Sequence, residues 1–149
     1  VDEASAAMGI ARASALNART KELLLTSQRD LYRMMAELAS TQQVAEKFRA
    51  IDAARVAWLE GETDAVTALI ELPKEFVVPG DTLSGAYLDL ARTIVRRAER
   101  IVVRLVHDGL VENVELVRYL NRLSSLLFVL GLYEAALAGV KTITLAKAP

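Results

Sequence analysis

The feature that most constrains this chain is a long run of helix-type periodicity, which follows the turn at Pro79-Gly80 and carries a row of arginines. Apolar side chains recur through the run at spacings of three and four residues, which is the period of an α-helix. Four arginines of the run lie four residues apart: Arg92, Arg96, Arg100 and Arg104. On a helix they form one ridge, and like charges at this spacing repel by about 0.2–0.5 kcal/mol per pair. The ridge therefore predicts partner carboxylates or a bound anion beside it.

Similar periodicity extends over most of the chain. It predicts helices over residues 1–18, 20–40, 53–70, 83–107 and 112–138. Residues 41–50 are ambiguous, because they can continue a helix or run extended. The sequence has no convincing strand alternation, internal repeat or low-complexity tract. We therefore expect a single all-α domain over residues 1–149, folded as an antiparallel up-and-down bundle of about five helices.

Several side chains mark the expected helix ends. Thr20 and Asp52 are predicted N-caps, and Gly109 is predicted to stop the helix over 83–107. The tail from Gly139 is expected to be loose. The apolar side chains expected to face the core include Leu69, Val114 and Leu137.

Composition excludes several classes of function. The net charge of −1 gives no general attraction to nucleic acid or to anionic membranes. Cysteine is absent and His107 is the single histidine, so neither a cysteine nor a multi-histidine metal site is expected within one chain. The longest apolar stretch, residues 123–133, is too short to span a bilayer, and nothing resembles a signal peptide. We expect a cytoplasmic protein with no nucleic-acid or membrane partner.

The polar residues on the two long C-terminal helices leave two interpretations open. The arginine ridge either forms structural ion pairs or binds an anion, since both arrangements have the same sequence pattern. Asn121, on a mostly apolar helix, either bonds to a neighbouring helix or contacts a ligand. Phe76 would ordinarily be a core side chain. The candidate carboxylates for structural ion pairs are Asp2, Glu3, Glu37, Asp89 and Glu134.

Three blocks of sequence resemble a known family. RTIVRRAER (92–100), YLNRLSSLLF (119–128) and FVVPG (76–80) are similar to the trimeric ATP:cob(I)alamin adenosyltransferases, which are ferritin-like helical bundles. VDE (1–3) and SQRDLYRMMAELA (27–39) are weaker matches to the first and second helices of that family. The first two blocks are specific when they occur together, and the resemblance covers nearly the whole chain.

The resemblance implies an activity and a set of partners. The reaction is transfer of the 5′-deoxyadenosyl group of ATP to reduced cobalamin, with release of triphosphate. It also implies Mg²⁺ bridging the phosphates, with no metal held by protein ligands alone. The expected assembly is a homotrimer with sites between subunits, and a cobalamin-dependent mutase is an expected recipient of the product.

The resemblance also implies roles for particular residues. Arg96 would be the main triphosphate ligand, and Arg92 would pair with Asp2 of a neighbouring subunit, which makes these three the implied catalytic residues. Phe76 would lie against the corrinoid, together with Arg92. The implied ATP-binding set is Arg96, Glu99, Asn121, Arg97 and Arg100.

The chain departs from the family pattern at several positions. It starts beyond the family's leading Gly-rich loop, and a protein truly lacking that loop is expected to lose ATP affinity. Asp81 stands where the family favours glycine, and Asp89 replaces a usual histidine. Ala4 and Ser5 also differ from the family residues. Two rival hypotheses follow: a relative that binds or delivers corrinoid without catalysis, and a structural oligomeric bundle whose arginines only bridge subunits.

Overall fold

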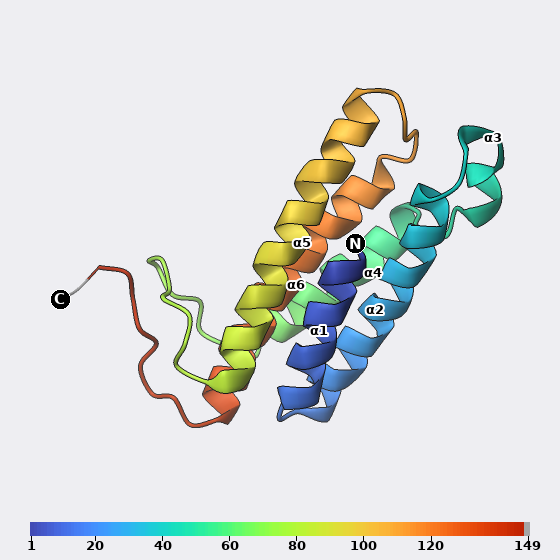
Figure 1. Cartoon of the computed structure of the whole chain (residues 1–149). Coiled ribbons are helices and arrows are strands. Elements are labelled where there is room, and N and C mark those ends of the chain that lie inside the picture. Colours follow the sequence, from blue (N-terminus) through green and yellow to red (C-terminus); the bar gives the residue numbers. More distant parts are fainter. Residues whose placement is uncertain (148–149) are drawn as a thin grey trace.

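The computed structural model describes residues 1–147, and its regular structure is helical (Figure 1). The expected all-α bundle is confirmed. Its five longer helices are α1 (Asp2–Ser14), α2 (Ala18–Leu38), α4 (Ala53–Thr67), α5 (Leu83–His107) and α6 (Glu115–Leu137). The ambiguous segment 41–50 contains a short helix α3 (Gln42–Ala45) and a 3-10 turn η1 (Glu46–Phe48), both without buried residues.

The five longer helices alternate in direction along the chain. Glu3 at the start of α1 meets Arg97 in the middle of α5, whereas the end of α1 lies near the C-terminal part of α6, where Glu134 accepts a hydrogen bond from the Leu16 amide. One neighbouring pair, α4 and α6, is parallel. Asn113, just before α6, donates to the carbonyl of Ile51, just before α4, and farther along the two helices Glu60 pairs with Arg122.

The core is one continuous cluster of apolar side chains, to which α6 contributes the most. Leu120, Leu123, Leu127 and Leu130 are fully buried, as their spacing predicted. Within residues 1–147, α6 is the one helix long and apolar enough to cross a membrane by length and composition. However, 56% of the relevant window is buried inside the bundle, as is usual for a central helix of a globular core.

Two predicted helix starts have different outcomes. The helix expected over residues 1–18 ends at Ser14, and Asn17 rather than Thr20 caps α2, with its side-chain oxygen accepting from the Arg19 amide at 2.8 Å. Thr20 instead lies buried within α2. The predicted cap at Asp52 is confirmed, because its carboxylate accepts from the Arg55 amide at 2.8 Å.

Three side chains that were expected to face the core are exposed, and each lies at or beyond a helix end. Leu69 lies two residues beyond the end of α4, Val114 is the N-cap of α6, and Leu137 is the last residue of α6. Helical periodicity does not fix side-chain direction where the helix stops. Those three predictions were therefore wrong.

The C-terminal tail is attached to the connector between α4 and α5, contrary to expectation. The Val78 amide donates to the Thr144 carbonyl at 2.8 Å, and the Ala146 amide donates to the Phe76 carbonyl at 2.7 Å. Between them, Val77 and Leu145 form an isolated antiparallel bridge. Connector and tail lie side by side at one end of the bundle (Figure 1), so they form one structural unit.

Candidate functional site

A cavity of about 480 Å³ opens between this paired segment and the bundle. We call it the connector pocket. Its walls come from the connector, from the first turns of α5, from the C-terminal half of α6 and from Ile143 of the tail. The α6 wall is apolar and consists of Leu127, Phe128, Gly131, Leu132 and Ala135. A largely apolar cavity with a few polar groups is typical of a site for an organic ligand.

Phe76 lies at the rim of the connector pocket rather than in the core. Its side chain is 88% exposed, although its carbonyl is held by the Ala146 amide. The ordinary interpretation of Phe76 as a core side chain was therefore wrong. A large exposed aromatic ring beside an apolar cavity is available to cover a ligand.

Two glycines, Gly85 and Gly131, lie where α5 and α6 meet beside the pocket, and Gly85 has no room for a side chain because of its own helix cap. A Cβ atom on Gly85 would lie 2.8 Å from the Thr82 hydroxyl oxygen and 3.5 Å from the Gly131 carbonyl oxygen. The Thr82 hydroxyl accepts from the Gly85 amide and caps α5, so it is not free to move away. Sequence reasoning missed both glycines, for which the one available signal was a glycine interrupting each helical pattern.

Arg92 forms the charged corner of the connector pocket. Its Nε donates to an Asp89 carboxylate oxygen at 2.7 Å, one helical turn earlier, and both side chains are more than two-thirds buried. Asp89 was one of the carboxylates considered as a structural partner. Asp2 lies exposed at the start of α1, and no bond joins it to Arg92 within residues 1–147.

A polar cluster lies farther along α5, where it faces α6. The Asn121 amide nitrogen donates to one Glu99 oxygen at 2.9 Å, and the Arg96 guanidinium lies 3.7 Å from the other. The Glu99 side chain is only 14% exposed, whereas that of Arg96 is 48% exposed. Glu99 thus holds Arg96 weakly and leaves most of its N–H donors open. Asn121 thus bonds to a neighbouring helix, which was one of its two interpretations. This contact brings together Asn121, Glu99 and Arg96, which all belong to the expected ATP-binding set.

A second cavity of about 440 Å³ lies beside this cluster, along the parallel pair α4 and α6. We call it the α4–α6 groove. Glu99 and Asn121 line it together with Glu60, Arg122, Arg118 and Glu115. One buried Glu115 oxygen has no hydrogen-bond partner within the described chain. The groove was not foreseen, because the pairing of α4 with α6 is a tertiary contact.

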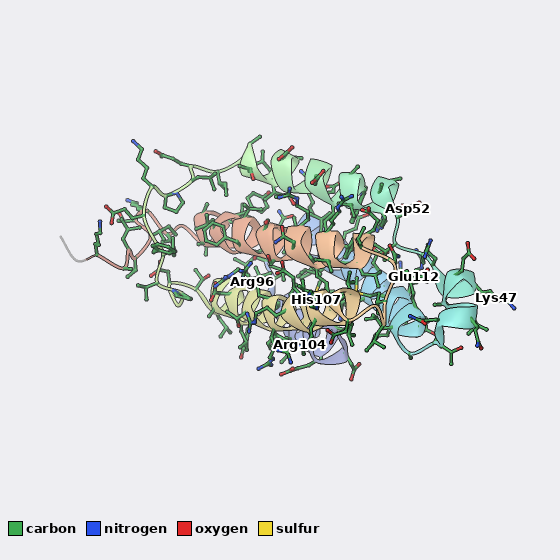
Figure 2. The ribbon with its side chains drawn as sticks, turned by 90° about the horizontal axis from the view of Figure 1, so that it is seen from above. Lys47, Asp52, Arg96, Arg104, His107 and Glu112 are labelled. Atoms are coloured by element: carbon green, nitrogen blue, oxygen red, sulfur yellow. The ribbon has the colours of Figure 1, made fainter. Side chains whose placement is uncertain are left out.

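The remaining arginines of the fifth helix differ in their surroundings. Arg97 pairs with Glu3 of α1, another of the carboxylates considered. Within residues 1–147, Arg100 and Arg104 form no ion pair. Figure 2 labels Arg96 and Arg104 along α5, with Arg96 nearer the connector end. In the ridge, Arg92 and Arg96 therefore form ion pairs with carboxylates, whereas Arg100 and Arg104 do not within residues 1–147.

Two other proposed carboxylate partners have different roles. Glu134 is fully buried and accepts from the Leu16 and Asn17 amides at the α1–α2 turn. Glu37 accepts from the buried Asn113 side chain. Both carboxylates stabilise chain turns and do not approach the ridge.

The fold defines a helical-bundle protein with one largely apolar cavity and one polar cavity beside the arginines of α5. The cobalamin adenosyltransferase family matches residues 1–134. Among curated relatives, the corrinoid adenosyltransferase PduO of Citrobacter freundii is 36% identical over 90% of this chain. A corrinoid adenosyltransferase of Mycobacterium bovis is 39% identical over 87% of this chain and 69% of its own length. The chain belongs to the cobalamin adenosyltransferase family.

Solved structures agree with this assignment. A variant PduO-type ATP:corrinoid adenosyltransferase from Lactobacillus reuteri, complexed with cobalamin and ATP, is 28% identical, with a TM-score of 0.85. That match covers 98% of this chain and 79% of the other. This chain spans 40% of the length of the Citrobacter PduO protein.

Proposed function

We propose that this protein is an ATP:corrinoid adenosyltransferase, which transfers the 5′-deoxyadenosyl group of ATP to cob(I)alamin and releases triphosphate. The observation that carries the proposal is the position of Arg92. It lines the apolar connector pocket and lies one turn from Arg96, which contacts the Glu99–Asn121 cluster. An apolar pocket for a large ligand thus adjoins a cluster of guanidinium and amide groups that comes from α5 and α6.

The nucleotide side would use the polar cluster. Arg96 offers a planar set of donors to phosphate oxygens, and its weak contact with Glu99 keeps it oriented without neutralising it. Arg97 and Arg100 would add positive charge nearby. Asn121 and Glu99 would hold the nucleoside, and the adjoining α4–α6 groove offers space for it. The protein's contribution is thus positioning and electrostatic stabilisation of the departing triphosphate.

The corrinoid side would use the connector pocket. Phe76 would lie against the macrocycle, where an apolar ring excludes water and disfavours an axial ligand on the cobalt. Arg92 would stand between the two substrates, and its pairing with Asp2 of a neighbouring subunit would complete the site. The reduced cobalt supplies the electron pair that attacks the 5′ carbon of ATP as the bond to the triphosphate breaks.

Mg²⁺ would be held mainly by the triphosphate oxygens. Within residues 1–147 no three histidine, cysteine, aspartate or glutamate side chains are grouped to hold a metal ion. Mg²⁺ commonly binds through substrate phosphates, water and at most one or two carboxylates. The residues present therefore fit a substrate-borne ion rather than a resident metal.

The proposal extends to assembly and cellular context. We infer a homotrimer from the family resemblance, and the half-exposed Leu90 and Ile101 on α5 offer apolar surface that an interface could cover. The site would then lie between subunits. We place the protein in the cytoplasm, with a cobalamin-dependent mutase as a recipient of adenosylcobalamin.

The test is an anaerobic assay with cob(I)alamin and ATP on the wild-type protein and on Arg96→Ala. We expect formation of adenosylcobalamin by the wild type and a loss of about 10²–10³-fold in kcat for the variant, as for removal of one electrostatic donor to a developing charge. Arg104→Ala removes an exposed arginine from the same helix and is the matched control, with near wild-type turnover expected.

Each other outcome has a definite meaning. Full turnover by Arg96→Ala would reject the role of that residue. A wild-type protein that binds cobalamin but forms no adenosylcobalamin would support delivery instead of catalysis. If neither ATP nor cobalamin raised the melting temperature, the protein would be a structural bundle.

A further inference from the structure

We propose that Asp81 and Thr144 form a clasp that fixes the connector against the C-terminal tail, which makes Asp81 a positioning residue for the ligand of the connector pocket. The inference deepens the proposed function and rests on it for the identity of that ligand as a corrinoid. Neither the family resemblance nor the arginine ridge assigned a positive role to Asp81 or any role to the tail.

The clasp consists of two hydrogen bonds to one carboxylate. One Asp81 oxygen accepts from the Thr144 amide at 2.9 Å, and the other accepts from the Thr144 hydroxyl at 2.7 Å. Because these bonds stabilise the ionised form, they lower the pKa of Asp81 below its usual range. The carboxylate is therefore charged at neutral pH and remains an acceptor for both donors.

Thr144 is also the residue through which the tail pairs with the connector. Its carbonyl accepts from the Val78 amide at 2.8 Å, and two residues later the Ala146 amide donates to the Phe76 carbonyl at 2.7 Å. Thr144 is thus bonded to the connector at three groups. Its amide and hydroxyl bond to Asp81, and its carbonyl bonds to Val78. The backbone of Phe76 is held by the same short ladder.

The position of the clasp connects it to the pocket. Asp81, Val78 and Phe76 all line the connector pocket, as does Ile143, the neighbour of Thr144. The paired segment forms the wall opposite α6, and it extends away from the bundle at the connector end (Figures 1 and 2). A two-stranded segment of this length is marginally stable alone. The two hydrogen bonds from Thr144 to Asp81 therefore stabilise this wall in its present conformation. The Phe76 ring lies at the rim of the same wall.

The first experiment measures the clasp itself by hydrogen–deuterium exchange, without any ligand. Asp81→Ala removes both acceptors, and we expect the amides of Val78 and Ala146 to exchange about three- to tenfold faster, as for loss of one or two hydrogen bonds. Asp81→Asn keeps an oxygen for the Thr144 amide and a side-chain group for its hydroxyl, so exchange near the wild-type rate is expected. Glu75→Gln, which alters only a 3.9 Å contact with Lys147, is the matched control.

The second experiment measures the effect on the proposed substrate. In steady-state assays, Asp81→Ala is expected to raise the KM for cob(I)alamin about three- to tenfold, with the KM for ATP and the melting temperature unchanged. Asp81→Asn is expected to restore the corrinoid KM. A general structural defect would change both KM values, so the split between the substrates identifies a positioning role.

Unchanged exchange at Val78 and Ala146 in Asp81→Ala would overturn the clasp. Faster exchange with an unaltered corrinoid KM would overturn its role in positioning. If the wild type had no transferase activity, hydroxocobalamin binding measured by absorbance would replace the KM. Weaker binding by Asp81→Ala would then support the clasp although the catalytic proposal had failed, and equal binding by both proteins would reject it.

Discussion

At the scale of single residues, Asp30 is a buried carboxylate that joins three helices. It extends from α2, is 1% exposed, and accepts from the Arg55 Nε of α4 and the Tyr119 hydroxyl of α6, both at 2.7 Å. The Arg55 guanidinium also lies 3.7 Å from the centre of the Trp58 ring. A buried charge with such partners costs little, but removing a partner leaves it partly unsatisfied.

The Tyr119 hydroxyl gives the first stability prediction. Burial, followed by the charge of Asp30, raises the pKa of Tyr119 well above its usual range. Between the ordinary tyrosine value of about 10 and that raised value, the unfolded chain binds fewer protons than the folded one. This contribution to the free energy of unfolding is therefore fully present below about pH 10 and is lost as pH rises through the raised pKa.

We expect Tyr119→Phe to lower the free energy of unfolding by about 1–3 kcal/mol at neutral pH and to weaken its fall between about pH 10 and 11. Urea denaturation at several pH values measures both effects. Tyr133→Phe, on the same helix, is the control for removal of a tyrosine hydroxyl outside the Asp30 contact. Equal alkaline slopes for Tyr119→Phe and the wild type would contradict the assignment.

At the scale of elements, glycines on helices and at their ends differ in what they do. Gly61 lies inside α4, and a Cβ atom there would have no atom within 4 Å. The helix passes through it, so the glycine is not required for the fold. Gly109 follows α5 with a φ of +70°, a conformation that side chains disfavour.

We predict that substitution of these two glycines by alanine changes the free energy of unfolding in opposite directions. Gly61→Ala should stabilise the protein by about 0.5–1 kcal/mol, because alanine loses less conformational freedom in a helix. Gly109→Ala should destabilise it by about 1–2 kcal/mol, the cost of a left-handed conformation with a Cβ atom. Denaturation midpoints at constant m-value measure both changes. A stabilised Gly109→Ala protein would show that this turn is not needed in its present form.

At the scale of the whole molecule, α5 carries several exposed apolar side chains among its arginines. Ile101 is 57% exposed on the same helix as the arginine ridge. If the proposed trimer buries this residue, a charge placed there would have to be desolvated without a partner.

We therefore expect Ile101→Glu to lower the molecular mass measured by light scattering, from that of a trimer toward that of a monomer. Leu69→Glu, a similar change at a residue of similar exposure just beyond α4, is the control and should leave the mass unchanged. A monomeric wild-type protein would reject the homotrimer. A trimeric Ile101→Glu protein would place the interface elsewhere.

Prediction from sequence succeeded where the signal is local and repeated. The helix over 83–107 was predicted with its observed bounds, because one periodic pattern extends from the Thr82 cap to Gly109. It failed at helix ends such as Leu69, and at the break between α1 and α2, where Asn17 caps the second helix. Asn17 is a preferred N-cap residue type, so a local signal for this break was present in the sequence and was missed.

For the candidate site, the family resemblance predicted Arg96, Glu99 and Asn121 as nucleotide ligands, and the fold brings these three residues together from two helices. The sequence did not identify the α4–α6 groove, the exposure of Phe76 or the bonds between Asp81 and Thr144. Asp81 and Thr144 are 63 positions apart in the chain. No periodic or local signal relates residues so far apart.

The sequence alone thus determined that this chain is a helical bundle and which residues on α5 and α6 carry charge, because a helix repeats every 3.6 residues and arranges its side chains in a fixed order. Only the tertiary structure decided which helices are neighbours, that α4 runs parallel to α6, and that the tail closes one wall of the connector pocket. Those choices depend on packing and on hydrogen bonds between distant segments, whose free energies appear only when the whole chain is folded.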